Sequence, residues 1–108
     1  MCVQTATIVM CLDADSYGPG ANSIDVSLSA PSSTSGMRRD YSTYLKYWVK
    51  SANAWKVVQS RTSYFSYSVN NSFSLAGMQA GSYRVSVTYR MNGDGAITEY
   101  HPAVTVRR

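Results

Sequence analysis

The clearest pattern in the chain is a strict alternation of apolar and polar residues after a glycine turn at Ala80-Gly81. Because successive side chains of a strand point to opposite faces, this alternation predicts a half-buried β-strand. We expect the rings and valines to face a core and the arginines and hydroxyls to face water or a partner. The apolar set is Tyr83, Val85, Val87 and Tyr89, and the polar set is Arg84, Ser86, Thr88 and Arg90.

The same period of two recurs in residues 23–29, 41–50 and 61–69, and further strands are expected at residues 5–10, which are rich in β-branched side chains, and at 55–59 and 97–106. Turn-forming residues separate these segments, as in Gly18-Pro19-Gly20 of the 13–22 loop, the 51–54 turn and the hairpin signal Asn92-Gly93-Asp94-Gly95. Pro102 marks the last segment as an edge strand or a bulge. About seven short strands at this spacing predict an all-β fold, a two-sheet antiparallel β-sandwich.

Aromatic side chains supply much of the expected core. Burying each large ring contributes about 1.5–3 kcal/mol, which a small sandwich can hardly forgo. Trp48 differs, because it is out of phase with its neighbours and shares the outer face with Lys46 and Lys50. The rings that the alternation points inward are Tyr47, Trp55, Phe65, Tyr67, Phe73, Tyr83 and Tyr89.

Composition adds limits on the class of protein. A length of 108 residues predicts one domain spanning residues 1–108. The formal net charge of +4 suits an acidic partner, but nucleic acid requires denser clusters of cations, so we expect no nucleic-acid binding. No apolar run approaches ~20 residues and the amino end lacks a signal-peptide pattern, so we expect no membrane insertion.

The two cysteines, Cys2 and Cys11, are expected to be free thiols. If the segment between them is one straight strand, rising ~3.3 Å per residue, their Cα atoms lie far beyond the ~7 Å limit for a disulfide. A bridge would require the segment to fold back. Their spacing does not resemble a zinc site either.

The chain has few titratable groups, and we therefore expect no catalysis and no cofactor. The chain has one histidine, five aspartates and one glutamate, with no acid–base pair at a fixed spacing. The serines are scattered through strands and loops, without a strand-to-helix elbow. His101 is therefore expected to be structural or solvated.

One half-motif points to calcium. Asp13 and Asp15, with Gly18 in the sixth place, match the start of a calcium loop, but the twelfth place holds Ile24 instead of the bidentate glutamate. A turn capped by aspartates explains the pattern as well. We expect no metal site and keep Asp13 and Asp15 as a calcium candidate.

Several segments in order carry a family resemblance: Tyr47-Trp48-Val49, then Trp55-Lys56-Val57-Val58-Gln59, then Phe73, then the 80–87 stretch. They resemble the triple-tyrosine modules repeated in secreted clostridial cell-wall amidases and related surface proteins. The resemblance covers about residues 23–106. It departs at Tyr47, where phenylalanine is usual, at Leu45, where tyrosine is usual, and at the missing proline before Ala80.

This resemblance implies an immunoglobulin-like or fibronectin type III-like sandwich in an extracellular or cell-surface protein. It implies an accessory or spacer role, and there are no catalytic residues to carry over. The chain is then a monomer or a module of a longer chain.

A candidate ligand site follows if the 41–50 strand pairs with the 83–90 strand. Trp48 then stands among cations, where it could stack a sugar ring or bind an anionic polymer. Alternatively, the lysine and arginine stems cover the indole as a self-contained cluster. The candidate residues are Trp48, Lys46, Lys50, Arg84 and Arg90.

The predicted function is a spacer, or binding to cell-wall or other carbohydrate polymer, in a secreted or surface protein. The alternative is a protein–protein assembly module, such as a phage or virus structural component, in which sheet edges pair between subunits.

Overall fold

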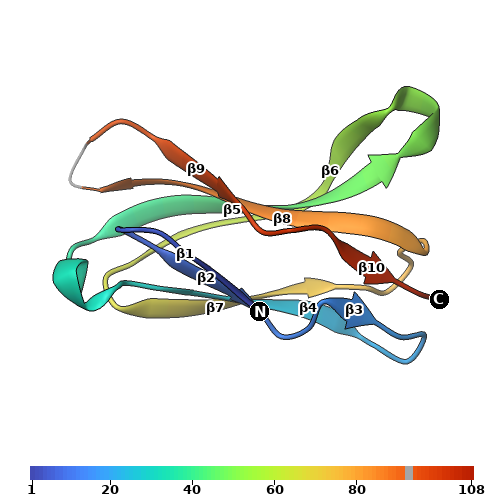
Figure 1. The fold of residues 1–108 in the computed structure, drawn as a ribbon, viewed down its shortest axis with the longest axis horizontal. Helices are drawn as coiled ribbons and strands as arrows, with labels where there is room; N and C mark the ends of the chain where they lie inside the picture. The colour runs from blue at the N-terminus through green and yellow to red at the C-terminus, as the bar shows by residue number, and fades with distance from the viewer. Residues whose placement is uncertain (92–93) are drawn as a thin grey trace.

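In the computed structural model, which describes residues 1–91 and 94–108, the chain folds into two β-sheets (Figure 1). The described residues contain ten strands rather than the seven expected. Two 3₁₀ turns, η1 (Ser32–Thr34) and η2 (Lys50–Ala52), interrupt them. The strands are β1 (Cys2–Gln4), β2 (Val9–Leu12), β3 (Ser16–Tyr17), β4 (Ser23–Ser29), β5 (Arg39–Val49), β6 (Ala54–Phe65), β7 (Ser68–Ser74), β8 (Gly81–Met91), β9 (Ile97–Tyr100) and β10 (Val104–Val106).

The predicted two-sheet β-sandwich is confirmed. One sheet has the strand order β1-β2-β4-β7, and the other has β3-β10-β8-β5-β6 with β9 also paired to β8. Neighbouring strands are antiparallel except β10 and β3, which run parallel. Among the residues described, no helix is long and apolar enough to cross a membrane.

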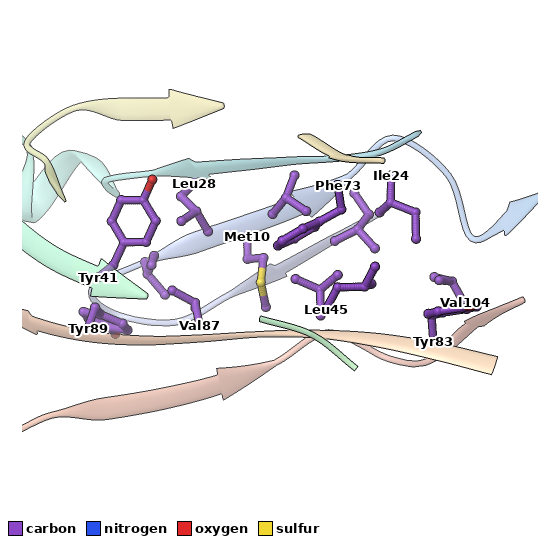
Figure 2. Packing of buried hydrophobic residues seen from close by; sticks show 14 of the residues in the cluster. Met10, Ile24, Leu28, Tyr41, Leu45, Phe73, Tyr83, Val87, Tyr89 and Val104 are labelled. Carbon is purple, nitrogen blue, oxygen red and sulfur yellow. The ribbon is translucent and has the colours of Figure 1, made fainter. Parts of the chain in front are cut away.

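The core lies between the two sheets (Figure 2). The strict alternation of β8 is confirmed, because its four apolar side chains are at most 1% exposed. From the opposite sheet, β4 contributes a matching apolar face, also as predicted. The facing residues are Tyr83, Val85, Val87 and Tyr89 of β8 and Ile24, Val26 and Leu28 of β4.

The amino-terminal segment corrects two expectations. It forms the hairpin β1–β2 instead of one strand over residues 5–10, because the Thr5 side chain accepts hydrogen bonds from the backbone N–H groups of Thr7 and Ile8 and closes a turn. Cys2 therefore lies directly opposite Cys11, with their Cα atoms 4.0 Å apart, and the two form a disulfide. The prediction of free thiols is wrong because the segment folds back.

The remaining differences in strand number have local causes. Residues 55–59 and 61–69 do not form two separate strands, since β6 runs unbroken to Phe65 and β7 starts in the other sheet. Pro102 lies between β9 and β10 and divides the last predicted strand in two, instead of marking one edge strand or a bulge. Part of the predicted hairpin turn, Asn92-Gly93, lies outside the described residues.

Most of the aromatic residues expected in the core are there, but two predictions are wrong. Tyr67 is 69% exposed, because β6 ends at Phe65 and the alternation does not continue through the bend. Trp55 lies on the outer face, because a β-bulge between Leu45 and its neighbour reverses the alternation along β6. Phe65, Phe73, Tyr83 and Tyr89 are buried as predicted, and Tyr47 is half-buried.

A buried arginine ties one end of the sandwich together. The Arg39 side chain is fully buried, and its guanidinium donates hydrogen bonds to the backbone oxygens of Thr7, Thr34 and Met37. Burial lowers the pKa of Arg39 from its ordinary value. The hydrogen bonds from the charged group to these carbonyls offset its desolvation and connect the β1–β2 turn to the loop before β5.

Candidate functional site

Four strands of the larger sheet place aromatic and cationic side chains together on its outer face. Lys46 of β5 lies directly opposite Arg84 of β8, and Trp48 lies directly opposite Trp55 of β6. Tyr100 lies on β9, opposite Ser86. We call Lys46, Trp48, Trp55, Arg84 and Tyr100 the aromatic–cationic cluster.

The rings and cations of the cluster are in contact. The Trp48 and Trp55 rings meet edge to face, with centroids 5.3 Å apart. The Arg84 guanidinium lies 4.7 Å from the Trp55 ring centroid and 4.5 Å from that of Tyr100, and the Lys46 ammonium lies 5.4 Å from the Tyr100 ring. These distances are within the range of cation–π attraction.

The cluster remains partly accessible. Tyr100 is 48% exposed, and the side chains of Trp48 and Trp55 are half-buried. Next to them, Val57 of β6 is also 48% exposed. The outer face therefore combines cations packed on the Trp55 and Tyr100 rings with partly accessible ring surface. Trp48 itself packs against Trp55, so its predicted roles in ligand binding and in a self-contained cluster both stay predictions.

The predicted site residues divide into two groups. Lys46, Trp48 and Arg84 come together in the cluster, as the predicted pairing of their strands requires. Lys50 lies past the end of β5 in η2 and lines a groove of about 580 Å³ with Trp48, Gly81 and other residues. Arg90 is separated from these residues.

Arg90 lies six positions beyond Arg84 on β8, a distance of about 20 Å along the strand. It is directly opposite Asp40 and borders a shallow depression of about 270 Å³. Ser42, Thr62 and Thr88 also border this depression, and their hydroxyls form cross-strand hydrogen bonds. This end of the outer face is polar and distinct from the cluster.

Sequence reasoning missed Trp55 and Tyr100. Trp55 could have been found from the hairpin register, since a short turn after Val49 brings Trp48 and Trp55 opposite each other. Tyr100 had a weaker signal, because its place beside Ser86 depends on how β9 pairs with β8.

Asp13 and Asp15, the calcium candidates, have different roles. The Asp13 carboxylate accepts hydrogen bonds from the Tyr17 hydroxyl at 2.5 Å and from the Asp25 backbone N–H at 3.1 Å. Burial, with help from this carboxylate, raises the pKa of Tyr17. Asp15 is exposed, and its backbone oxygen accepts from the N–H of Thr105. In the described ranges no group of three His, Cys, Asp or Glu gathers in a way that could hold a metal ion.

His101 is buried at the break between β9 and β10. Its Nδ1 lies 2.9 Å from the Pro102 oxygen, and its Nε2 lies 3.4 Å from the Met1 oxygen. The ring connects the carboxyl-terminal strands to the amino end of the chain, which is the structural placement that the sequence suggested.

Comparison with protein-family models, with curated proteins and with solved structures finds no match to this chain. Its class is therefore defined by the fold, a β-sandwich, and its candidate site by the aromatic–cationic cluster.

Proposed function

We propose that the protein is a non-catalytic, immunoglobulin-like or fibronectin type III-like module of a secreted or surface protein that binds cell-wall or other polysaccharide. The observation that carries this proposal is the outer sheet face on which Trp48, Trp55 and Tyr100 gather with two cations. Rings of this kind can stack on the apolar faces of sugar rings, and cations add attraction for charged polymers.

The strand order supports the immunoglobulin-like type. Taking β2, β4 and β7 as strands A, B and E gives one sheet, and β6, β5, β8 and β10 as C′, C, F and G give the other. Immunoglobulin-like sandwiches divide their strands between sheets in this way.

A tyrosine at the start of β8 supports the same type. The Tyr83 hydroxyl donates a 2.7 Å hydrogen bond to the backbone oxygen of Gln79, four residues earlier, in the manner of the tyrosine corner at the start of strand F. Burial raises the pKa of Tyr83. The Tyr47 ring packs 5.0 Å from the Tyr83 ring and leaves no room for a Cβ at Gly81, whose φ is 149°.

The disulfide between Cys2 and Cys11 supports an extracellular location. Disulfides persist in oxidising compartments and are rare in reducing ones. The location agrees with the resemblance of residues 23–106 to triple-tyrosine modules of secreted proteins.

Substitution of Trp48 tests the proposal. Trp48→Ala removes the ring that packs edge to face on Trp55, and we expect it to weaken binding to purified cell walls and polysaccharides at least about tenfold, since an aromatic ring in a binding site contributes about 1–3 kcal/mol. Pull-down and affinity electrophoresis measure the binding, and thermal unfolding measures the fold.

Tyr64→Ala is the matched control. Tyr64 is also an exposed ring on the outer face, with its own cation–π partner in Arg38 at 4.0 Å, but it lies at the far end of β6. Unchanged binding by Trp48→Ala, or equal losses in both variants, would contradict the proposed site. A collapse of the Trp48→Ala melting temperature would make Trp48 a structural residue.

One observation favours the alternative, assembly through sheet edges. β6 is an edge strand of twelve residues that pairs only with β5 in the sheet order. An unpaired edge of this length can add a strand from another chain. The oligomeric state of the protein separates this function from polysaccharide binding.

A further inference from the structure

The aromatic–cationic cluster places two positive charges directly opposite each other. Lys46 and Arg84 face one another across the β5–β8 ladder. Like charges at this position in an antiparallel pair are destabilising. Within the described ranges, the single salt bridge joins Arg38 to Asp40 at the other end of the sheet, so no carboxylate there offsets the pair.

Two polar atoms in the same place lack partners. The Arg84 Nε and the Ser86 Oγ are buried, and neither has a hydrogen-bond partner among the described residues. The two residues are two positions apart on β8, so both point to the outer face, and Tyr100 lies against them as the residue opposite Ser86 and 4.5 Å from the guanidinium. A buried donor without an acceptor destabilises the folded state.

A bound anion would offset the repulsion between Lys46 and Arg84, and by pairing with the rest of the guanidinium it would offset the desolvation of that group. A carboxylate accepts two hydrogen bonds from a guanidinium in a planar, bidentate arrangement. It would also offset the two positive charges of Lys46 and Arg84. A polymer of neutral sugars could stack on the rings, but it would leave the opposed charges of Lys46 and Arg84 as they are.

We propose that the cluster binds an acidic polysaccharide, in which a sugar ring stacks on Trp48 and a carboxylate of the polymer pairs with Arg84. Lys46 adds a second positive charge beside the same carboxylate. This inference rests on the proposed polysaccharide-binding function and names its substrate class, a polymer of carboxylate-bearing sugars.

The test compares charged polymers with neutral copies of the same polymers. The probes are polygalacturonate, alginate and hyaluronate, each beside its methyl ester, which keeps the sugar rings and removes the charge. Calorimetric titration at low salt measures the affinities. We expect the acid forms to bind at least about tenfold more tightly than the esters, the size of effect expected for a charge-assisted pair.

Two arginine variants locate the effect. Arg84→Gln is expected to remove the preference for acid over ester, with the acid affinity falling about tenfold. Arg90→Gln is the matched control, because it removes the same charge from the same face of the same strand outside the cluster, and its affinity should stay within about twofold. Lys46→Gln provides a second variant, with a smaller loss of the same preference, if Arg84→Gln does not fold.

Each other outcome has a definite meaning. Equal binding of acids and esters that is lost in Trp48→Ala overturns the charge recognition and leaves polysaccharide binding standing. Absence of binding to every polymer overturns both. Equal losses of affinity in Arg84→Gln and Arg90→Gln would indicate general charge attraction. Tighter binding to a poly(dT) oligonucleotide than to any acid polymer would indicate a nucleic-acid surface. Either result overturns the inference.

Discussion

Individual tyrosines have different roles here because their hydroxyls have different surroundings. Tyr17 and Tyr83 are buried, and each donates its hydroxyl proton within the protein, to Asp13 and to Gln79 respectively. Burial raises the pKa of both phenols. Tyr64 and Tyr100 keep about half of their surface exposed and pack on cations instead.

The raised pKa of Tyr17 predicts a loss of stability at alkaline pH. The folded state keeps the phenol protonated above pH 10, where the unfolded chain releases the proton, so the contribution is complete below pH 10 and declines as pH rises further. The decline is at most about 1.4 kcal/mol per pH unit for one such group. Urea unfolding at pH 9 and pH 11 measures it.

Tyr17→Phe is the variant for this experiment. At pH 7 it should be less stable than wild type by about 1 kcal/mol, because the hydrogen bond to Asp13 is lost. Between pH 9 and pH 11 it should lose less stability than wild type does, because it has no phenol at this position to ionise. Tyr64→Phe, at an exposed position, should follow the wild-type pH dependence. An alkaline decline in Tyr17→Phe as steep as that of wild type would refute the role of Tyr17.

At the scale of elements, the β5–β6 hairpin decides the composition of the site. The bulge between Leu45 and Lys46 leaves β6 with one more residue than β5 in this region, so the two halves of β6 have opposite alternation. Phe65 therefore points to the core and Trp55 to the outer face. Figure 1 shows this hairpin rising away from the sandwich at one end.

The β1–β2 hairpin is closed by a disulfide as well as held by the packing of Met10 and Leu12 in the core. Cys2 to Cys11 closes a short loop of the chain, and constraining such a loop in the unfolded state stabilises the fold by about 2–3 kcal/mol. We expect Cys2→Ser with Cys11→Ser to lower the free energy of unfolding by up to that amount while the sandwich remains. Chemical denaturation measures the loss.

Reduction of the wild-type protein provides the control for this prediction. Dithiothreitol should lower the stability of wild type to that of the double variant and leave the double variant unchanged. An identical stability of wild type with and without reductant would show that the bridge contributes nothing to the fold.

At the scale of the whole molecule, the protein is expected to be a monomer of 11.9 kDa. The edge strand β6 carries Lys56 and Arg61 and contains the bulge, and charged side chains and bulges on an edge oppose pairing with another chain. The net charge of +4 adds repulsion between copies. Sedimentation equilibrium at low and physiological salt measures the mass.

A monomer that co-sediments with polysaccharide supports the proposed function. A defined oligomer without affinity for polysaccharide would support assembly through β6 instead. Breaking that oligomer with Val57→Lys, an added charge at an exposed position of the edge strand, would assign the contact to this edge.

Much of the fold could be predicted because it depends on local alternation. The β4 strand and its inward Ile24 and Leu28, and the four inward residues of β8, follow from a period of two that any half-buried strand requires. Arg39 could not be predicted as a core residue. Its burial depends on carbonyl groups from the adjacent loop and from the distant turn at Thr7, and no local pattern reveals that the two meet.

The candidate site was predicted only in part, for a similar reason. Lys46, Trp48 and Arg84 share a face because their strands alternate and pair, and alternation is visible in the sequence. Trp55 and Tyr100 join them through a bulge and a strand pairing, both of which are properties of register. A change of register by one residue moves a side chain to the opposite face.

The sequence by itself determined that the chain would form strands, that those strands would pack as two sheets, and which face of β8 would be buried. Those outcomes follow from the chemistry of neighbouring residues and the need to bury apolar surface. The tertiary structure alone decided that Cys2 meets Cys11, that Arg39 is buried and that Trp55 and Tyr100 enclose Arg84. The physical reason is that each of these contacts joins segments whose distance in space depends on turns, bulges and strand pairing.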